Sequence, residues 1–192
     1  IIYILVAILA LNSCDVLDMK PLDKVSDADV WEDSALIELY VNASYNSINH
    51  EFSQHMLSDA SDETYCIHNW ANFWVIQKGE MTSDNVTGIS EKINYWKSAY
   101  SNIRTINVFF DRIDDAPVET DLKNRMKGEM KFIRAWIYAN LIWRYGDVPL
   151  ITDLFELNQD YKVKRDSYSD CVDFITKELD EAMTWLLSLI HI

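Results

Sequence analysis

Apolar residues recur at the spacing of an α-helix in four long segments of the chain: 34–51, 90–113, 119–145 and a segment that begins at Asp166. The predicted inner faces consist of Leu36, Leu39, Tyr40, Ala43 and Ile48; Ile93, Trp96, Tyr100, Ile103, Asn107 and Phe110; Phe132, Ile133, Trp136, Ala139, Leu141, Ile142 and Tyr145; and Cys171, Val172, Ile175, Leu179, Ala182 and Leu186. Helices with one apolar stripe each bury that stripe against one another. The pattern therefore predicts an all-α fold of stacked antiparallel helices.

Polar and helix-breaking residues indicate where these helices begin and end. Ser90 is a candidate N-cap of the second helix, and Gly146 followed by Pro149 ends the third. We expect an extended stretch at 147–152 after this stop. Residues 53–88 show no helical period, and a connection of this length is usually functional or contains short elements of its own. Long irregular loops are therefore expected beside the helices.

The start of the chain has the pattern of a lipoprotein signal peptide. Residues 1–13 carry no charge, and their apolar run is too short to span a bilayer comfortably before it reaches Cys14. We expect a signal peptide at 1–13, a lipid on Cys14, a polar tether at 14–30 and a helical domain at 31–192. An ordinary signal peptide or a buried N-terminal strand is the alternative. The sequence begins without an initiator Met, and no helix cap follows its last apolar residues. We therefore expect a sequence that is truncated at both ends.

Composition narrows the class of protein further. Hydrophobic residues make up 49% of the 192 residues, which excludes an intrinsically disordered chain, and only four Gly and three Pro are present, as in proteins of long helices. The net charge of −14 argues against binding to nucleic acid. Cys66 and Cys171 could form a disulfide, but the position of Cys171 on an apolar helix face favours a buried free thiol.

Four ordered motifs resemble those of the SusD/RagB family of outer-membrane lipoproteins. They are Cys14 with its polar tether; Trp96-x-x-x-Tyr100-x-x-Ile103-x-x-x-Asn107; Gly128-Glu129-x-Lys131-Phe132-x-Arg134-Ala135 continued by Tyr145-Gly146-Asp147-Val148-Pro149-Leu150-Ile151; and Arg165-Asp166-Ser167 with Val172, Phe174, Ile175, Glu178, Leu179 and Ala182. Met130 departs from the small residue that is usual after Gly-Glu. The resemblance implies tetratricopeptide-like stacking of the helices, although the chain has no clean period of about 34 residues.

The resemblance also implies a function. Members of that family are lipid-anchored at the cell surface, where they capture oligosaccharides or other nutrients and pass them to a TonB-dependent, SusC-like transporter in the outer membrane. By this resemblance the chain is not an enzyme and needs no cofactor. Two alternatives remain open. One is a helical-repeat interaction lipoprotein without a small ligand, and the other is a surface glycosidase.

The irregular segment contains aromatic and amide side chains that suit a sugar ligand. Trp rings stack on the C–H face of a sugar, while Asn and His side chains hydrogen-bond its hydroxyl groups. The predicted ligand-binding residues are His68, Asn69, Trp70, Asn72 and Trp74, with Phe73 in the same cluster. Alternatively, the three aromatic side chains of this cluster pack the loop onto the helices.

Charged and polar residues inside the predicted helices are interpreted as structural. Glu129 and Arg134 resemble a catalytic or ligand-binding pair, but a charge in a buried helix needs a partner, so both are predicted to clamp helices together. Asn107, on an apolar stripe, is expected to bond a neighbouring backbone group.

The remaining acidic and imidazole side chains lack the spacing of a reactive site. Asp59, Asp62 and Glu63 are interpreted as solvated loop acids, because neither the ligand order of a calcium loop nor a glycosidase pair is visible. The i, i+4 spacing that zinc ligands on one helix need is absent from His50, His55 and His68. We therefore expect no metal site and no catalytic residue.

Overall fold

The structure, a computed structural model, describes residues 27–48, 57–68, 72–82, 84–86, 94–155 and 162–187. Its helices are α2 (Asp27–Glu32), α3 (Ser34–Ser44), η1 (Tyr45–Ser47), η2 (Leu57–Ala60), α4 (Trp74–Gln77), α5 (Trp96–Arg112), α6 (Thr120–Tyr145) and α7 (Tyr168–Leu187). In the part of the chain that is described, the only other pairing is an isolated antiparallel bridge between Val148 and Asp166. The prediction of an all-α fold is confirmed.

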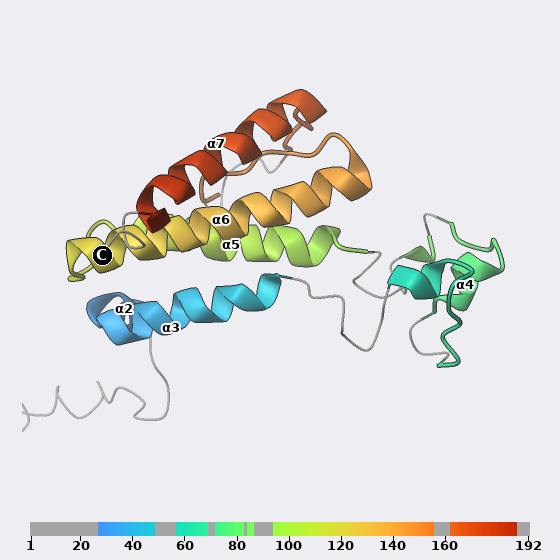
Figure 1. The fold of residues 1–192 in the computed structure, drawn as a ribbon, viewed down its shortest axis with the longest axis horizontal. Helices are drawn as coiled ribbons and strands as arrows, with labels where there is room; N and C mark the ends of the chain where they lie inside the picture. The colour runs from blue at the N-terminus through green and yellow to red at the C-terminus, as the bar shows by residue number, and fades with distance from the viewer. Residues whose placement is uncertain are drawn as a thin grey trace, which may run out of the picture.

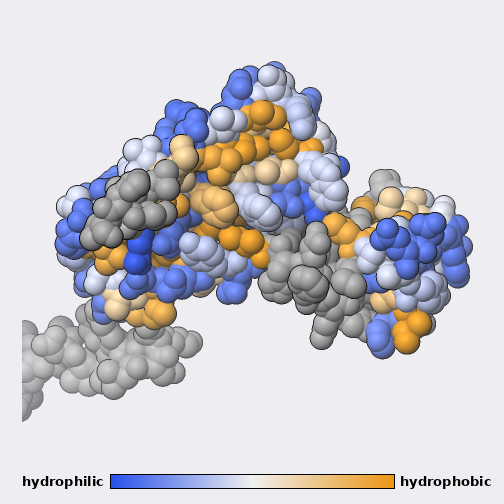
Figure 2. All heavy atoms as spheres, in the orientation of Figure 1, coloured by the Kyte–Doolittle hydropathy of each residue, from blue (hydrophilic) through white to orange (hydrophobic). Residues whose placement is uncertain are grey.

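The longest helix, α6, lies at the centre of the helical part (Figure 1). α7 runs along α6 on one side, while α5 and α3 pack against it on others. The short α2 packs on α3, and Trp31 of α2 contacts Phe109 of α5, with ring centroids 6.4 Å apart. On the face shown in Figure 2, hydrophobic residues appear as patches between polar ones. Among the described helices, none is long and apolar enough to cross a membrane.

Local sequence explains both ends of α6. The Glu119 carboxylate caps the helix, because Oε2 accepts hydrogen bonds from Asp121 N at 2.8 Å and Leu122 N at 3.2 Å. Gly146 ends it with φ 68°, a backbone conformation that favours glycine, and donates its N–H to Ile142 O at 3.0 Å. The predicted start and stop of this helix are thus correct.

The inner faces of α3 and α7 differ from the prediction. On α3, Leu39 is 61% exposed and the buried residues include Ile37 and Val41. The sequence of α3 is apolar on more than one side, so its periodicity fits two orientations. On α7, Val172 and Leu179 are each 39% exposed. The buried position between them is Glu178, a charged residue that a search for apolar periodicity leaves out.

Three further expected core residues are exposed. Ala43 lies on the outside of α3, and Phe132 and Trp136 of α6 are 38% and 39% exposed. The core of α6 is formed instead by a neighbouring stripe at helical spacing, Met126, Met130, Ile133, Ile137 and Leu141.

Two predicted helix boundaries are also wrong. The first long helix ends at Ser44 and continues only as the 3₁₀ turn η1, short of residue 51. The second begins at Trp96, because the Tyr145 hydroxyl accepts the backbone N–H groups of Tyr95 and Trp96, at 2.9 and 3.1 Å. Ser90 lies outside the described residues, as do residues 1–26 with Cys14.

The irregular segment contains two short helices, η2 and α4, as its length suggested. We call the described residues between 57 and 86 the small lobe; they lie beside one end of the helical part (Figure 1). Cys66 in this lobe and Cys171 in α7 are free thiols, and Cys171 is fully buried. The alternative of a disulfide between them is not realised.

Candidate functional site

A groove of about 750 Å³ runs along the small lobe and is lined by residues 60–65, Trp74, Gln77 and Lys78. We call it the Trp74 groove. Its volume falls in the range of about 300–1,000 Å³ that is usual for small-molecule sites. Carboxylate, amide, hydroxyl, phenol and indole groups all reach its walls. The groove can therefore offer both a flat apolar surface and hydrogen-bonding groups to a ligand.

Hydrogen bonds of Gln77 hold the two sides of the groove together. Its Nε2 donates to Asp59 O and to Thr64 O, each at 3.1 Å, and so joins α4 to the segment that begins with η2. Thr64 Oγ1 donates to Asp59 Oδ1 at 2.8 Å, which fixes the same segment internally. Gln77 Oε1 is buried and forms no hydrogen bond within the described residues.

Trp74 is positioned by its neighbours in sequence. Phe73 and Val75 are buried, 1% and 6% exposed, and anchor α4 in the lobe. Trp74 between them is only half-buried and lines the groove. The Lys78 ammonium lies 4.7 Å from the centre of the Trp74 ring, which places a cation at the indole. Asn72 precedes the helix with φ 56°, which Asn tolerates better than most residues.

Of the predicted ligand-binding residues that the structure describes, one lies at the groove. Trp74 lines it, Asn72 forms the turn before α4, and His68 is exposed and does not line it. Phe73 of the same cluster is buried, as the packing alternative predicted for it. Asn69 and Trp70 lie outside the described residues. The assignment of these residues to a ligand stays a prediction.

Several groove residues were not identified from the sequence. Gln77 and Lys78 follow Trp74 by three and four positions, the spacing of one helix face, but a helix of four residues has no detectable period. Tyr65, 67% exposed, is the second aromatic side chain of the groove. Asp62 and Glu63, predicted to be solvated loop acids, are exposed residues on its wall.

The predicted helix clamps lie in the helical part, away from the groove. Arg134 and Asn107 are buried, and Arg134 Nη1 donates to Asn107 Oδ1 at 3.0 Å. Asn107 Nδ2 donates to Ile151 O at 3.0 Å, a backbone group beyond α6. Glu129 does not pair with Arg134 but with Arg125 on its own helix, at 3.3 Å. Burial raises the pKa of Tyr45, and so does the Glu129 carboxylate, which accepts a hydrogen bond from the Tyr45 hydroxyl.

Comparison with protein families gives one match that covers most of the chain. Residues 15–190 match the SusD-like family described as starch-binding and associating with the outer membrane. A SusD-like protein of Formosa agariphila, P38, is 24% identical over 184 residues, which cover 93% of this chain and 35% of that protein.

Solved structures of similar proteins share the fold. A SusD-like protein from Bacteroides fragilis is 27% identical with a TM-score of 0.72 and covers 87% of this chain and 32% of its own. A SusD-like carbohydrate binding protein from the same species is 24% identical with a TM-score of 0.64; the match covers 81% of this chain and 32% of that protein. A laminarin binding SusD-like protein is 20% identical with a TM-score of 0.61; the match covers 80% of this chain and 34% of that protein. The chain thus spans about a third of the length of these relatives.

Proposed function

Because this chain belongs to the SusD-like family, whose members are described as starch-binding proteins associated with the outer membrane, we propose that it binds glycans at the cell surface and passes them to a TonB-dependent, SusC-like transporter. In this proposal the protein binds the glycan and neither cleaves nor modifies it. The observation that carries the proposal is the Trp74 groove, where an indole, a phenol and a set of hydrogen-bonding groups line one open surface.

The groove chemistry matches that of a sugar. The indole of Trp74 and the phenol of Tyr65 provide apolar surfaces for the C–H face of a sugar ring. Lys78 provides a donor and Glu63 provides acceptors for its hydroxyl groups. The groove volume of about 750 Å³ can hold part of a glycan chain. Starch and laminarin, which are named for relatives of this chain, are the glycans to test first.

Membrane attachment belongs to the same proposal. In it the lipid on Cys14 anchors the protein and the tether at 14–30 gives it reach toward the transporter. Anchoring beside a transporter raises the local concentration of both partners, so a weak affinity for each sugar suffices. A Cys14→Ser protein is expected in the soluble fraction; if it stayed with the membranes through a high-salt wash, the lipid anchor would be excluded.

Affinity gel electrophoresis of the purified protein in starch, laminarin and other glycans tests the binding function. We expect one glycan to retard the unaltered protein, and Trp74→Ala to remove the retardation. The matched control is Trp136→Ala, which deletes a partly exposed indole of α6 that does not line the groove.

Three other results would change the assignment. Retardation that persists in Trp74→Ala keeps the function but moves the site away from the groove. No retardation in any glycan favours the helical-repeat interaction protein instead. Release of shorter sugars from the glycan would show a glycosidase.

A further inference from the structure

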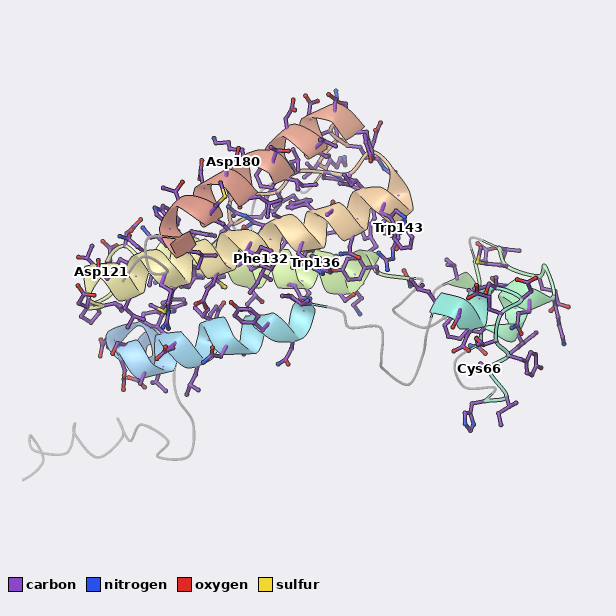
Figure 3. All side chains as sticks on the ribbon, in the orientation of Figure 1. Cys66, Asp121, Phe132, Trp136, Trp143 and Asp180 are labelled. Atoms are coloured by element: carbon purple, nitrogen blue, oxygen red, sulfur yellow. The ribbon has the colours of Figure 1, made fainter. Side chains whose placement is uncertain are left out.

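A second hollow lies between the small lobe and the C-terminal end of α6. Its volume is about 360 Å³, within the usual range for small-molecule sites. Leu57, Met81 and Val86 line it from the lobe, and Asn94, Trp143 and Arg144 line it from the helical part. Trp143 stands at the end of α6 that is nearer the lobe (Figure 3). We call this second depression the Trp143 hollow.

Hydrogen bonds and ring contacts fix the helical side of the hollow. Tyr145, which also lines it, holds the first N–H groups of α5 through its hydroxyl. Arg144 Nη1 donates to Asn140 O and Oδ1, each at 3.0 Å. The guanidinium carbon of Arg144 then lies 4.7 Å from the Trp143 ring centre and 5.0 Å from that of Tyr95. The Trp143 ring is thus oriented before any ligand arrives, which lowers the entropy cost of binding.

Despite this support, Trp143 is 67% exposed. An oriented indole with so much free surface is a stacking platform for an apolar face. Beside it, the Asn94 side chain forms no hydrogen bond within the described residues, so its amide can donate to or accept from a ligand. An exposed indole next to an unused amide is the combination that a sugar ring requires.

The charges around the hollow favour an uncharged ligand. The chain carries a net charge of −14, but among the described residues none that lines the hollow is acidic. Arg144, the charged residue in the described lining, is engaged in ring contacts and in the bonds to Asn140. The other lining groups are aliphatic, thioether, aromatic or amide. Such walls match the C–H face and hydroxyl groups of a neutral sugar.

The hollow and the Trp74 groove flank the same short element. Leu57, the first residue of η2, lines the hollow, and Ala60, the last, lines the groove. Three residues of a 3₁₀-helix advance by only about 6 Å. One glycan chain can therefore reach from one depression to the other.

We propose that the Trp143 hollow is a second subsite, which stacks one neutral sugar ring on Trp143 while other rings of the same chain lie in the Trp74 groove. This inference rests on the proposed glycan-binding function. When one ligand occupies two subsites, the second contact forms within the complex, so the overall affinity exceeds that of either subsite alone. The affinity of the protein should therefore rise with the length of the oligosaccharide.

Calorimetric titration with maltooligosaccharides and laminarin oligosaccharides of increasing length tests the subsite. In the unaltered protein, affinity should increase once the chain is long enough to span both depressions. Trp143→Ala should leave the affinity for the shortest bound oligosaccharide unchanged and weaken the longest by roughly tenfold, the value of one good aromatic contact. Trp143→Phe should recover part of the loss, and Asn94→Ala should show a smaller one.

Trp136→Ala is the matched control, because it removes a partly exposed indole of the same helix outside the hollow. Circular dichroism checks that each variant is folded. If Trp143→Ala binds all lengths like the unaltered protein while Trp74→Ala does not, the subsite is excluded and the function stands. If the unaltered protein binds neither these oligosaccharides nor any glycan in the affinity gels, the proposed function and the subsite both fail.

Discussion

Arg134 of α6 and Glu178 of α7 form a buried ion pair, with Nε 2.7 Å from Oε2 and both side chains under a tenth exposed. Glu178 also accepts a hydrogen bond from Lys131 Nζ at 2.6 Å. Through Asn107, Arg134 reaches α5 and the backbone of Ile151. One guanidinium therefore connects three helices and the segment that follows α6.

Replacement of Glu178 should be strongly destabilising. Glu178→Gln leaves Arg134 buried without its carboxylate, and breaking one side of a buried pair usually costs about 3–5 kcal/mol. We expect a loss of this size in the free energy of unfolding, measured by urea denaturation.

The control is the double change Arg134→Met with Glu178→Leu. It removes both charges together, and apolar replacement of a whole buried pair is often neutral or stabilising. A double variant as unstable as the single one would show that the loss comes from packing rather than from an unpaired charge.

The Tyr145 hydroxyl should stabilise the fold, because it accepts hydrogen bonds from the first backbone N–H groups of α5. Tyr145→Phe leaves the N–H groups of Tyr95 and Trp96 without this acceptor, and an unsatisfied polar group costs about 1–3 kcal/mol. The expected result is a lower midpoint of urea unfolding.

Tyr95→Phe is a matched change with the opposite expectation. The Tyr95 hydroxyl is buried and has no hydrogen-bond partner in the described part of the chain. Its removal relieves a desolvated polar group and keeps the ring against Arg144, so stability should stay equal or rise. If both Phe variants lost the same stability, the two hydroxyl groups would not differ as the structure indicates.

Stability should fall in alkaline solution. Burial raises the pKa of Tyr95 from 10.0 to about 12, and burial together with the Glu129 carboxylate raises that of Tyr45 to about 12. A pKa raised in the folded state means that the stabilisation is fully present below pH 10 and is lost as the pH rises toward 12. Urea midpoints measured across this range should drop, and phenolate absorbance should appear together with unfolding.

The Tyr95→Phe variant isolates one of these two groups. Its urea midpoint should fall less steeply between pH 10 and pH 12 than that of the unaltered protein, because one raised pKa is absent. Equal slopes would exclude Tyr95 as a cause of the alkaline loss.

Gly128 should not accept a large side chain. A Cβ at this position would stand 3.0 Å from Leu186 Cγ and 3.3 Å from Ala182 O, where α6 meets α7. Gly128→Leu is expected to lower the free energy of unfolding by about 1–3 kcal/mol through overpacking. Gly128→Ala should have a much smaller effect, because the better helix propensity of Ala, worth up to about 1 kcal/mol, offsets the milder crowding. A Leu variant of unchanged stability would contradict the close helix contact.

The sequence predicted those features that local interactions determine. The start and stop of α6 follow from a capping carboxylate and from Gly146, both within a few residues of the helix end. The start of α5 could not be predicted in this way, because the acceptor for its first N–H groups is Tyr145, about fifty residues later. The partner of Arg134 lies 44 positions away for the same reason.

The candidate site was predicted less completely than the helices. Trp74 stood out as an aromatic residue in an irregular segment, and the structure places it in a groove. Gln77 and Lys78 gave no signal, because α4 is only one turn long. The Trp143 hollow combines the end of α6 with a lobe that precedes it by some sixty residues, a proximity that only the folded chain reveals.

The outward position of Phe132 and Trp136 affects how separate molecules of this protein interact in solution. These side chains lie one helical turn apart on α6 and form an apolar strip that favours self-association (Figure 3). The net charge of −14 opposes this through repulsion between molecules. Salt screens the repulsion but not the apolar attraction, and acid neutralises the carboxylates. Colloidal stability should therefore be greatest in dilute buffer near neutral pH.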